Sequence, residues 1–294
     1  MVRFTFSFAA ATLIAAAPPP APSVTPAAVV QGAPRADWRA FAPDDLLVID
    51  LADGGRVVVA LAPDFAPAHT ANVRALARTH WSDGTVIERV QDDYVTQWGD
   101  PNNRALPAGV VSRPPAEYDR SAAGLTFTPL PYKDAYAPQV GLAGAFPVAA
   151  GQGRAWLAHC YGMVGVGRDL APDTGSGAEL YAVIGQAPRA LDRNIAVVGR
   201  VVAGMERLTA LPRGTAELGF YADPSQRVGI RRVRLASDLP PAERPAFEWL
   251  DPASASFARW VTVRANRHDA FFERPAGALD LCNALPPVRP LPGR

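Results

Sequence analysis

The sequence predicts a mostly β fold, in which antiparallel strands close into a barrel that short helices plug. Short apolar stretches rich in valine and isoleucine recur along the middle of the chain, with turn residues between them. Only two short segments of that region, which begin near Pro67 and Gly204, have apolar residues at helical spacing. There is no internal repeat and no regular alternation of strands and helices. Many strands with two short helices favour a closed barrel.

The composition bounds the class of protein. With 294 residues, the chain can hold one large domain, or one domain with extensions. Hydrophobic residues make up 49% and charged residues 19%, so the chain can bury a sizeable core. The formal net charge of +1 argues against nucleic acid as a partner, because phosphate binding needs a strongly basic face. The four histidines are scattered without zinc-ligand spacing, so neither a metal nor a cofactor is expected.

Residues 1–17 have the pattern of a secretory signal peptide. Arg3 precedes an apolar run, and the small residues Ala15 and Ala17 stand where cleavage is expected. The run is shorter than the roughly 20 apolar residues that span a bilayer, so no stable membrane span is expected after its removal. Pro18 is unfavourable directly after a cut, which leaves the cleavage position open, and a disordered apolar N-terminus is the alternative. The pattern predicts a periplasmic or secreted protein.

The first elements of the predicted domain follow a segment rich in proline and alanine. That segment, residues 18–43, is expected to be an extended linker. The apolar stretches Leu46–Leu51 and Val57–Leu61 flank a Gly-Gly turn and predict a β-hairpin. A helix is expected from Pro67, because proline is favoured in the first helical turn. A further strand region is expected from Val86 to Thr96.

The second half of the chain combines an irregular segment, more strands and a tail. Residues 102–156 are rich in proline and glycine without a sustained period, and predict a long loop inserted into the domain. Further strands are expected at Tyr161–Gly167, Leu180–Ile184, Ile195–Val202 and within 228–236. Residues 239–294 form a C-terminal extension with apolar residues at helical spacing from Phe257 to Val261. This extension is expected to pack on the barrel, because it is too small to fold alone.

The sequence contains two cysteines, Cys160 and Cys282. In an exported protein they could form one disulfide bond, and two unrelated buried thiols are the alternative. The sequence leaves both possibilities open. The neighbouring His159 is interpreted as a packing residue, because adjacent residues of a strand point to opposite faces and a thiol–imidazole pair is therefore not expected.

The order of several motifs resembles the cyclophilin family of peptidyl-prolyl cis/trans isomerases. The motifs are DGTVIERV, YVTQWGDP, GMVGVGRD, SGAELYAVIG and LDRNIAVVGRVVAGME, and they follow a hairpin and a helix that begins with proline. The resemblance extends from about Asp45 to Ala236, and we therefore expect a domain over residues 45–236. It implies an eight-stranded antiparallel barrel capped by two helices.

The resemblance also implies which residues form the site. The family pattern FHRVIPGFMIQGGD is similar to IERVQDDYVTQWGD here, which implies Arg89 as the catalytic arginine and Gln97 as its glutamine partner. Tyr94 and Val95 then take the positions of apolar groove walls.

A second family pattern, GSQFFI, is similar to GAELYA here. It implies that Glu179 stands at the glutamine and Tyr181 at a phenylalanine of the substrate groove. The remaining substrate-binding positions implied by the resemblance are Gly167, Leu191 and Ile195.

Several positions differ from the family pattern. Glu88 and Glu179 replace a histidine and a glutamine, and Trp98 replaces a glycine. Ile195 stands where many members have histidine, and Ala190 stands where many have tryptophan. Because that tryptophan contributes to cyclosporin binding in the family, weak inhibition by cyclosporin is expected. The carboxylates imply altered specificity or reduced turnover.

The expected function is isomerisation of X–Pro bonds in unfolded or proline-containing chains, which would assist protein folding. Rotation about this bond meets a barrier of ~18–20 kcal/mol, and no covalent bond is made or broken. Such a site needs placed charge and a dry pocket, and no nucleophile. The alternative is a peptide-binding chaperone or scaffold that uses the same groove without catalysis. A monomer is expected, with unfolded or proline-containing polypeptides as partners.

Overall fold

The computed structural model describes residues 24–269 and 271–292, so the predicted signal peptide, residues 1–17, lies outside the described residues. Eight strands form the barrel: β2 (Leu46–Leu51), β3 (Arg56–Leu61), β4 (Val86–Val90), β5 (Val95–Gly99), β11 (Met163–Val166), β12 (Leu180–Val183), β13 (Val197–Ala203) and β14 (Val228–Leu235). They close in the order β11-β12-β5-β4-β14-β2-β3-β13, and every neighbouring pair is antiparallel. The predicted fold class is confirmed.

The barrel core follows from the alternation of side chains along each strand. In β3, Val57, Val59 and Leu61 point into the core, and inward residues of the other strands meet them. Two helices complete this core. Helix α2 (Pro67–Arg78) begins with the predicted proline and contributes Val73, and helix α3 (Met205–Thr209) contributes Leu208. The two predicted capping helices are therefore present.

The prediction that residues 102–156 form a loop is wrong from Arg120 onward. A five-stranded antiparallel sheet lies there, in the order β6-β10-β9-β8-β7. Its strands are β6 (Arg120–Ser121), β7 (Thr128–Pro129), β8 (Gln139–Ala143), β9 (Phe146–Gly151) and β10 (Arg154–Leu157). Glycines interrupt the strand pattern of this segment, and at least one of them is required by the packing of the sheet. A Cβ on Gly141 would lie 2.2 Å from the carbonyl oxygen of Thr128, so this close pairing requires glycine.

The interpretation of residues 18–43 as an extended linker is wrong for the part that the structure describes. Helix α1 (Pro26–Gln31) begins after Thr25, whose side chain accepts a hydrogen bond from the backbone N–H of Ala28. Strand β1 (Trp38–Ala40) then pairs antiparallel with β15 (Phe247–Leu250). Proline in this segment opens a helix instead of extending a linker.

The C-terminal extension forms a second core together with the insertion and the N-terminal segment. Its helix α4 (Ala255–Ala265) is capped by Ser254, and β16 (Val288–Pro290) pairs with β15. Phe257 and Trp260 of α4 share one buried cluster with Val29 of α1 and with residues of the insertion sheet. Met163 and Val197 of the barrel belong to the same cluster, so the extension packs on the barrel along one side of this second core. It also packs on the outer face of β2 and β3, where Leu239, Phe247 and Trp249 share a smaller cluster with Val48 and Val58.

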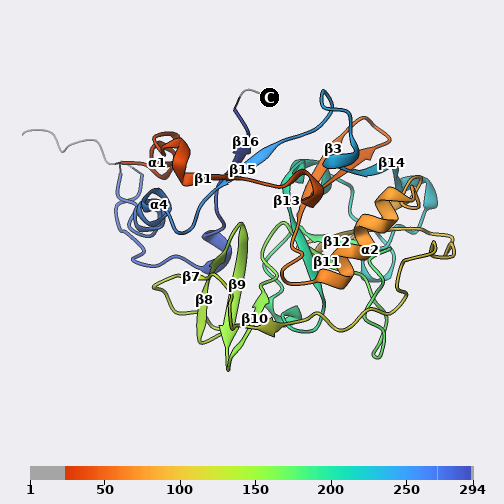
Figure 1. Ribbon diagram of the computed structural model, residues 1–294, viewed down its shortest axis with the longest axis horizontal. Coiled ribbons are helices and arrows are strands. Elements are labelled where there is room, and N and C mark those ends of the chain that lie inside the picture. The colour runs from red at the N-terminus through yellow and green to blue at the C-terminus, as the bar shows by residue number, and fades with distance from the viewer. Residues whose placement is uncertain (1–23, 270, 293–294) are drawn as a thin grey trace, which may run out of the picture.

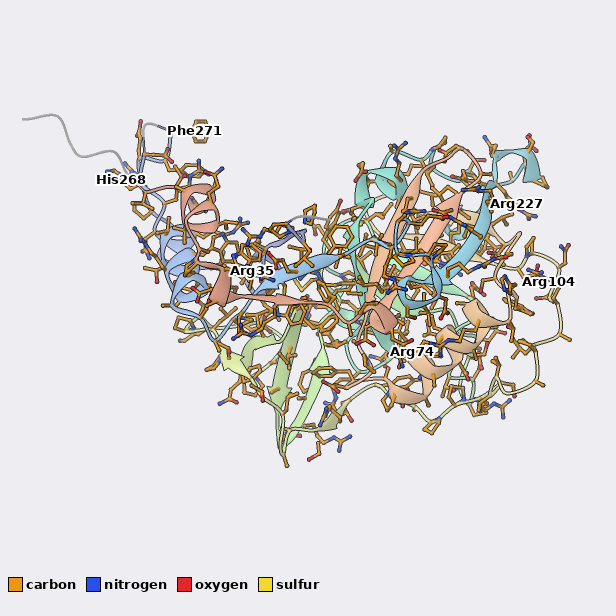
Figure 2. All side chains as sticks on the ribbon, turned by 45° about the horizontal axis from the view of Figure 1, so that its top comes forward. Arg35, Arg74, Arg104, Arg227, His268 and Phe271 are labelled. Atoms are coloured by element: carbon orange, nitrogen blue, oxygen red, sulfur yellow. A yellow bond between two sulfur atoms is a disulfide. The ribbon has the colours of Figure 1, made fainter. Side chains whose placement is uncertain are left out.

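Figure 1 shows this second part, with α1 and α4, beside the barrel, and the insertion sheet next to both. In Figure 2, Arg35, His268 and Phe271 lie at the end formed by α1 and α4, whereas Arg104 and Arg227 lie at the opposite end. A disulfide bond joins Cys160 to Cys282, with 5.0 Å between the two Cα atoms. Among the described residues, no helix is long and apolar enough to cross a membrane.

Candidate active site

A groove of about 580 Å³ lies on the outer surface of the barrel, where β4, β5 and β12 run side by side. Side chains alternate along these strands. Trp98 and Leu180 point into the barrel core, whereas Gln97 and Tyr181, which pair across the two strands, line the groove. The bulky Trp98 at a family glycine position therefore fills the barrel interior and leaves the groove open.

All nine residues that the sequence analysis assigned to the site line this one groove. They are Arg89, Tyr94, Val95, Gln97, Gly167, Glu179, Tyr181, Leu191 and Ile195. They come from β4, β5 and β12 and from the segments that follow β4, β11 and β12, and more than 100 positions separate the first from the last. Their roles in catalysis and binding remain predictions, but the structure brings the residues themselves together.

The guanidinium of Arg89 is held on three sides. Nη1 donates a hydrogen bond to Oε1 of Gln97 at 2.7 Å, and Nε donates to the carbonyl oxygen of Leu218 at 2.6 Å. Nη2 donates to the side-chain oxygen of Gln91. Its Cζ atom lies 5.7 Å from the ring centre of Tyr94, within the range of a cation–π contact. Among the described residues, no carboxylate forms an ion pair with Arg89.

The segment around Leu218 is the part of the site that sequence reasoning missed. Arg89 and Phe220 form an antiparallel bridge, and the Phe220 ring centre lies 5.5 Å from the Arg89 guanidinium. Leu218 and Phe220 both line the groove. Gly219, at φ +80°, allows the close approach, because a Cβ there would lie 2.6 Å from Cα of Gln91. The only signal in the sequence was this glycine in a short polar loop.

The polar wall of the groove continues from Gln97 to Glu179. The side-chain N–H of Gln97 donates to Oε1 of Glu179. Glu179 lies directly over Gly167. A Cβ on Gly167 would be 2.9 Å from the carboxyl carbon of Glu179. Gly167 therefore provides the space in which the Glu179 carboxylate reaches the glutamine.

Burial changes the charge balance of this wall. Burial raises the pKa of Glu179, and the hydrogen bond from Gln97 and the charge of Arg89 only partly oppose this change. Burial also raises the pKa of Glu88, with repulsion from Glu179 as a further cause. Burial lowers the pKa of Arg89, while Tyr94, Glu179 and Tyr181 act in the opposite direction. An arginine nonetheless keeps its charge at neutral pH.

The opposite wall is apolar. Val95 and Tyr181 form a small buried cluster with Val183, and Tyr94 and Ile195 pack against it. Leu191, from the short helix Arg189–Leu191, also lines the groove. The groove therefore presents a charged guanidinium on one side and an apolar surface on the other. This arrangement can polarise an amide, and among the described residues that line it no nucleophile is paired with a base.

Comparisons with known proteins agree with this geometry. The chain matches the family described as cyclophilin-type peptidyl-prolyl cis-trans isomerase/CLD over residues 46–235. Probable peptidyl-prolyl cis-trans isomerases of Brucella suis and Brucella melitensis are each 26% identical to it over 201 residues, which cover 67% of this chain and 84% of theirs.

The crystal structure of the cyclophilin AquaCyp293 from Hirschia baltica is similar with a TM-score of 0.67 at 22% identity. The match covers 84% of this chain and 94% of that one, and at this identity it supports the fold alone. The family match, residues 46–235, begins with the first residue of β2 and ends with the last residue of β14. Because it spans the whole barrel on which the groove lies, the chain belongs to the cyclophilin-type peptidyl-prolyl cis-trans isomerase family.

Proposed function

We propose that the protein isomerises X–Pro bonds of unfolded or proline-containing chains, with Arg89 as the catalytic residue and Gln97 as its polar partner. The observation that carries the proposal is the position of Arg89 between a polar wall and an apolar wall of one groove. The barrier to rotation arises from amide resonance, so a catalyst must favour the twisted amide over both planar forms.

The donor inventory of Arg89 supports this role. A guanidinium has five N–H donors, and Gln91, Gln97 and Leu218 accept from one each. The two remaining donors are available to a peptide. The three accepted hydrogen bonds fix the guanidinium plane before a substrate arrives, so little reorganisation is needed during the reaction. Tyr94, Val95 and Tyr181 supply the apolar pocket for the proline ring.

A second candidate function is peptide binding without efficient catalysis, as in a chaperone or scaffold. The observation that favours it is the contact between Gln97 and Glu179, which occupies an amide donor that a substrate carbonyl would otherwise use. Glu88 adds a further carboxyl group to the same groove. Both groups stand where the family pattern has other residues.

One measurement separates the two functions. The rate of cis/trans exchange of a short X–Pro peptide is measured by NMR with and without the protein, and peptide binding is measured by titration on the same sample. Accelerated exchange is expected for the wild type. Saturable binding without acceleration would replace the isomerase proposal by the chaperone. Absence of both would contradict the groove as a peptide site.

We also propose that the protein acts in a periplasmic or extracellular compartment. The signal-like pattern of residues 1–17 and the Cys160–Cys282 disulfide support this, because disulfides persist in oxidising compartments. Thr25 caps α1 and Val29 is buried in the second core, so cleavage is expected before Thr25. N-terminal sequencing of the native protein tests this, and an intact Met1 on a cytoplasmic protein would contradict export.

A further inference from the structure

The hydroxyl group of Tyr181 extends beyond the groove wall into the protein interior. There it lies 3.0 Å from Nε2 of His159, within hydrogen-bond distance, and the two rings are nearly parallel, with 13° between their planes. Tyr181 is 5% exposed and His159 is 1% exposed. Burial raises the pKa of Tyr181, so the hydroxyl keeps its proton. A wall for a proline ring needs only the apolar face of the aromatic ring, so this buried polar pair has another role.

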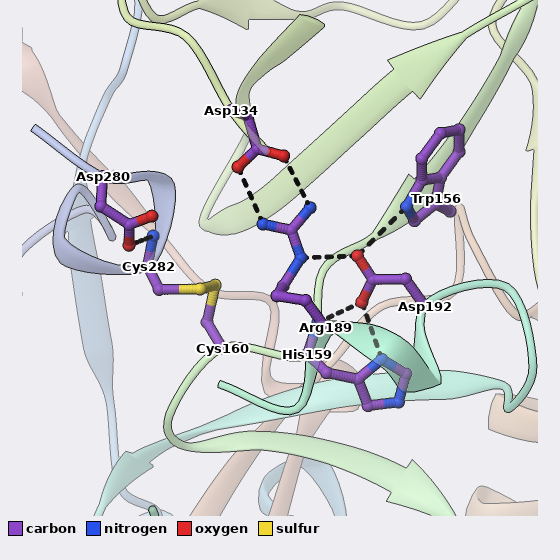
Figure 3. The surroundings of a disulfide bond; sticks show 8 residues. All are labelled: Asp134, Trp156, His159, Cys160, Arg189, Asp192, Asp280 and Cys282. Atoms are coloured by element: carbon purple, nitrogen blue, oxygen red, sulfur yellow. Dashed lines mark hydrogen bonds and ion pairs between the residues drawn. A yellow bond between two sulfur atoms is a disulfide. The ribbon is translucent and has the colours of Figure 1, made fainter. Parts of the chain in front are cut away.

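A chain of buried polar groups continues from His159 into the insertion (Figure 3). Oδ1 of Asp192 accepts from the backbone N–H of His159 at 2.9 Å and lies 3.1 Å from Nδ1 of its ring. Oδ2 of Asp192 accepts from Nε of Arg189 at 2.6 Å. The two Nη atoms of Arg189 donate to the carboxylate of Asp134 at 3.0 and 3.3 Å. The network therefore runs from the groove wall to the insertion.

This network is buried along its whole length. The side chains of Asp134 and Arg189 are 4% exposed and that of Asp192 is 7% exposed. Burial alone would raise the pKa of Asp192, but hydrogen bonds from His159 and the charge of Arg189 lower it. Buried charges that are fully paired have few alternative arrangements, because breaking any one contact leaves an uncompensated charge in a medium of low dielectric. The imidazole of His159 is therefore held in one orientation.

Two further features fix the same contact. Gly165 pairs with Tyr181 across the β11–β12 ladder, and a Cβ on Gly165 would lie 2.3 Å from the Tyr181 hydroxyl oxygen. A larger residue there would close the space that the hydroxyl uses to reach His159. Cys160, which follows His159 directly, is bonded to Cys282, so the segment that carries the imidazole is tied to the C-terminal extension.

We propose that His159 is a positioning residue of the proline pocket, which fixes the ring of Tyr181 through its hydroxyl. Asp192 and Arg189 hold His159 in turn, and Asp134 makes the insertion part of this support. The inference rests on the proposed peptide-binding function of the groove. A ring fixed at both its face and its hydroxyl end presents the proline with a wall in one position. A ring held by packing alone could shift. Loss of the His159 contact is therefore expected to change substrate affinity more than the rate of the chemical step.

The test is a double-mutant cycle on the full-length protein. Tyr181→Phe removes the hydroxyl, His159→Phe removes its partner, and the double variant removes both. NMR exchange of an X–Pro peptide gives KM and kcat for each protein. One hydrogen bond of ordinary net strength corresponds to about a fivefold change. Each single variant is expected to raise KM about fivefold with a smaller change in kcat, and the double variant is expected to add little beyond the singles.

His159→Gln and Ser254→Ala serve as controls. Glutamine carries a polar group that can reach the hydroxyl of Tyr181, so His159→Gln is expected to restore part of the loss in KM. Ser254→Ala weakens the N-cap of α4, far from the groove in the second core, and is expected to lower stability with KM unchanged. It therefore distinguishes a general loss of stability from a loss of positioning.

The possible outcomes separate this inference from the proposed function. The positioning role would be overturned if all three variants kept the wild-type KM. It would also be overturned if the effects of the two single variants multiplied in the double variant. Neither result would contradict the proposed isomerase activity. If the wild type binds the peptide without catalysis, the same cycle is measured on the dissociation constant. If it does neither, the proposed function fails. The exchange rate of the Tyr181 hydroxyl proton, measured by NMR and expected to rise in His159→Phe, then tests the contact with His159 without reference to catalysis.

Discussion

Nη1 of Arg89 donates a hydrogen bond to Oε1 of Gln97 at 2.7 Å, and the two side chains come from neighbouring strands of the barrel. The glutamine also donates to Glu179, so a single amide connects the guanidinium to a carboxyl group. The charge that faces the groove therefore depends on three side chains acting together. This relationship determines the first two predictions.

Arg89→Ala is expected to lower kcat/KM for an X–Pro peptide by at least about tenfold, which corresponds to roughly 1.4 kcal/mol in the barrier. The physical reason is the loss of the positive charge that Gln97 orients in the groove. NMR exchange measures the rate, and circular dichroism checks the fold. Arg213→Ala, at a partly exposed arginine that pairs with Asp92 and does not line the groove, is the control and should leave the rate unchanged. Undiminished activity in Arg89→Ala would show that the mechanistic assignment is wrong.

Glu179→Gln is expected to keep or raise the activity and to remove a pH dependence. The pKa of Glu179 is raised in the folded protein by burial, so its contribution to stability is fully present at low pH and is lost as pH rises through that pKa. The wild type should therefore lose stability relative to Glu179→Gln as the pH rises above the ordinary range of a carboxyl pKa. Activity of the wild type should rise as the pH is lowered through the same pKa, because the neutral carboxyl group no longer opposes Arg89.

Urea unfolding and NMR exchange across this pH range measure both effects. Glu206→Gln, at a carboxylate that is 76% exposed, is the control and should follow the wild-type profile. Parallel profiles for the wild type and Glu179→Gln would exclude Glu179 as the titrating group.

Removal of the disulfide is expected to destabilise the second core. The bond closes a loop of 122 residues, for which the chain-entropy argument gives about 4–5 kcal/mol. The double variant Cys160→Ser, Cys282→Ser should therefore unfold at a clearly lower urea concentration than the oxidised wild type. With reductant present, the wild type should shift toward the variant and the variant should not change. Equal midpoints under oxidising conditions would show that the bond adds no stability.

Cyclosporin is expected to inhibit the wild type weakly or not at all. Ala190 is exposed next to the groove residue Leu191, and it provides neither the size nor the N–H group of the family tryptophan. Ala190→Trp should increase inhibition, whereas Ala190→Leu, which adds apolar size without a donor, should increase it less. Titration of activity with cyclosporin measures this. Tight, stoichiometric inhibition of the wild type would show that the residues around Leu191 are misaligned with the family.

The sequence predicted the barrel because its strands carry local patterns. The apolar runs of β2, β3 and β13 are typical of strands, and Pro67 marks the start of α2. The insertion sheet was missed because β6 and β7 are only two residues long and Gly141 is needed for close pairing. Helix α1 has six residues and is stabilised by packing of Val29, which no local pattern reveals.

The candidate site shows the same division. Residues of the two strand motifs, such as Arg89 and Tyr181, could be assigned because their order along the chain resembles a family. Leu218 acts through its backbone carbonyl, for which the side chain gives no signal. His159 was interpreted as a packing residue on the assumption that it lies in a strand with Cys160. The structure places both residues after the end of β10. There the His159 side chain contacts Tyr181, and the Cys160 side chain is bonded to Cys282.

The small sheet β1-β15-β16 has a mechanical consequence. β1 and β16 each pair antiparallel with β15 and so run in the same direction, while the barrel lies between β1 and β15 along the chain. A force that pulls the two ends of the protein apart therefore loads this sheet lengthwise, in shear, before it reaches the barrel. Arg35 and Arg289, which pair with the buried Glu248 at 2.5 and 2.7 Å, lie on the same path. The three short strands therefore tie the chain that enters the barrel to the chain that leaves it.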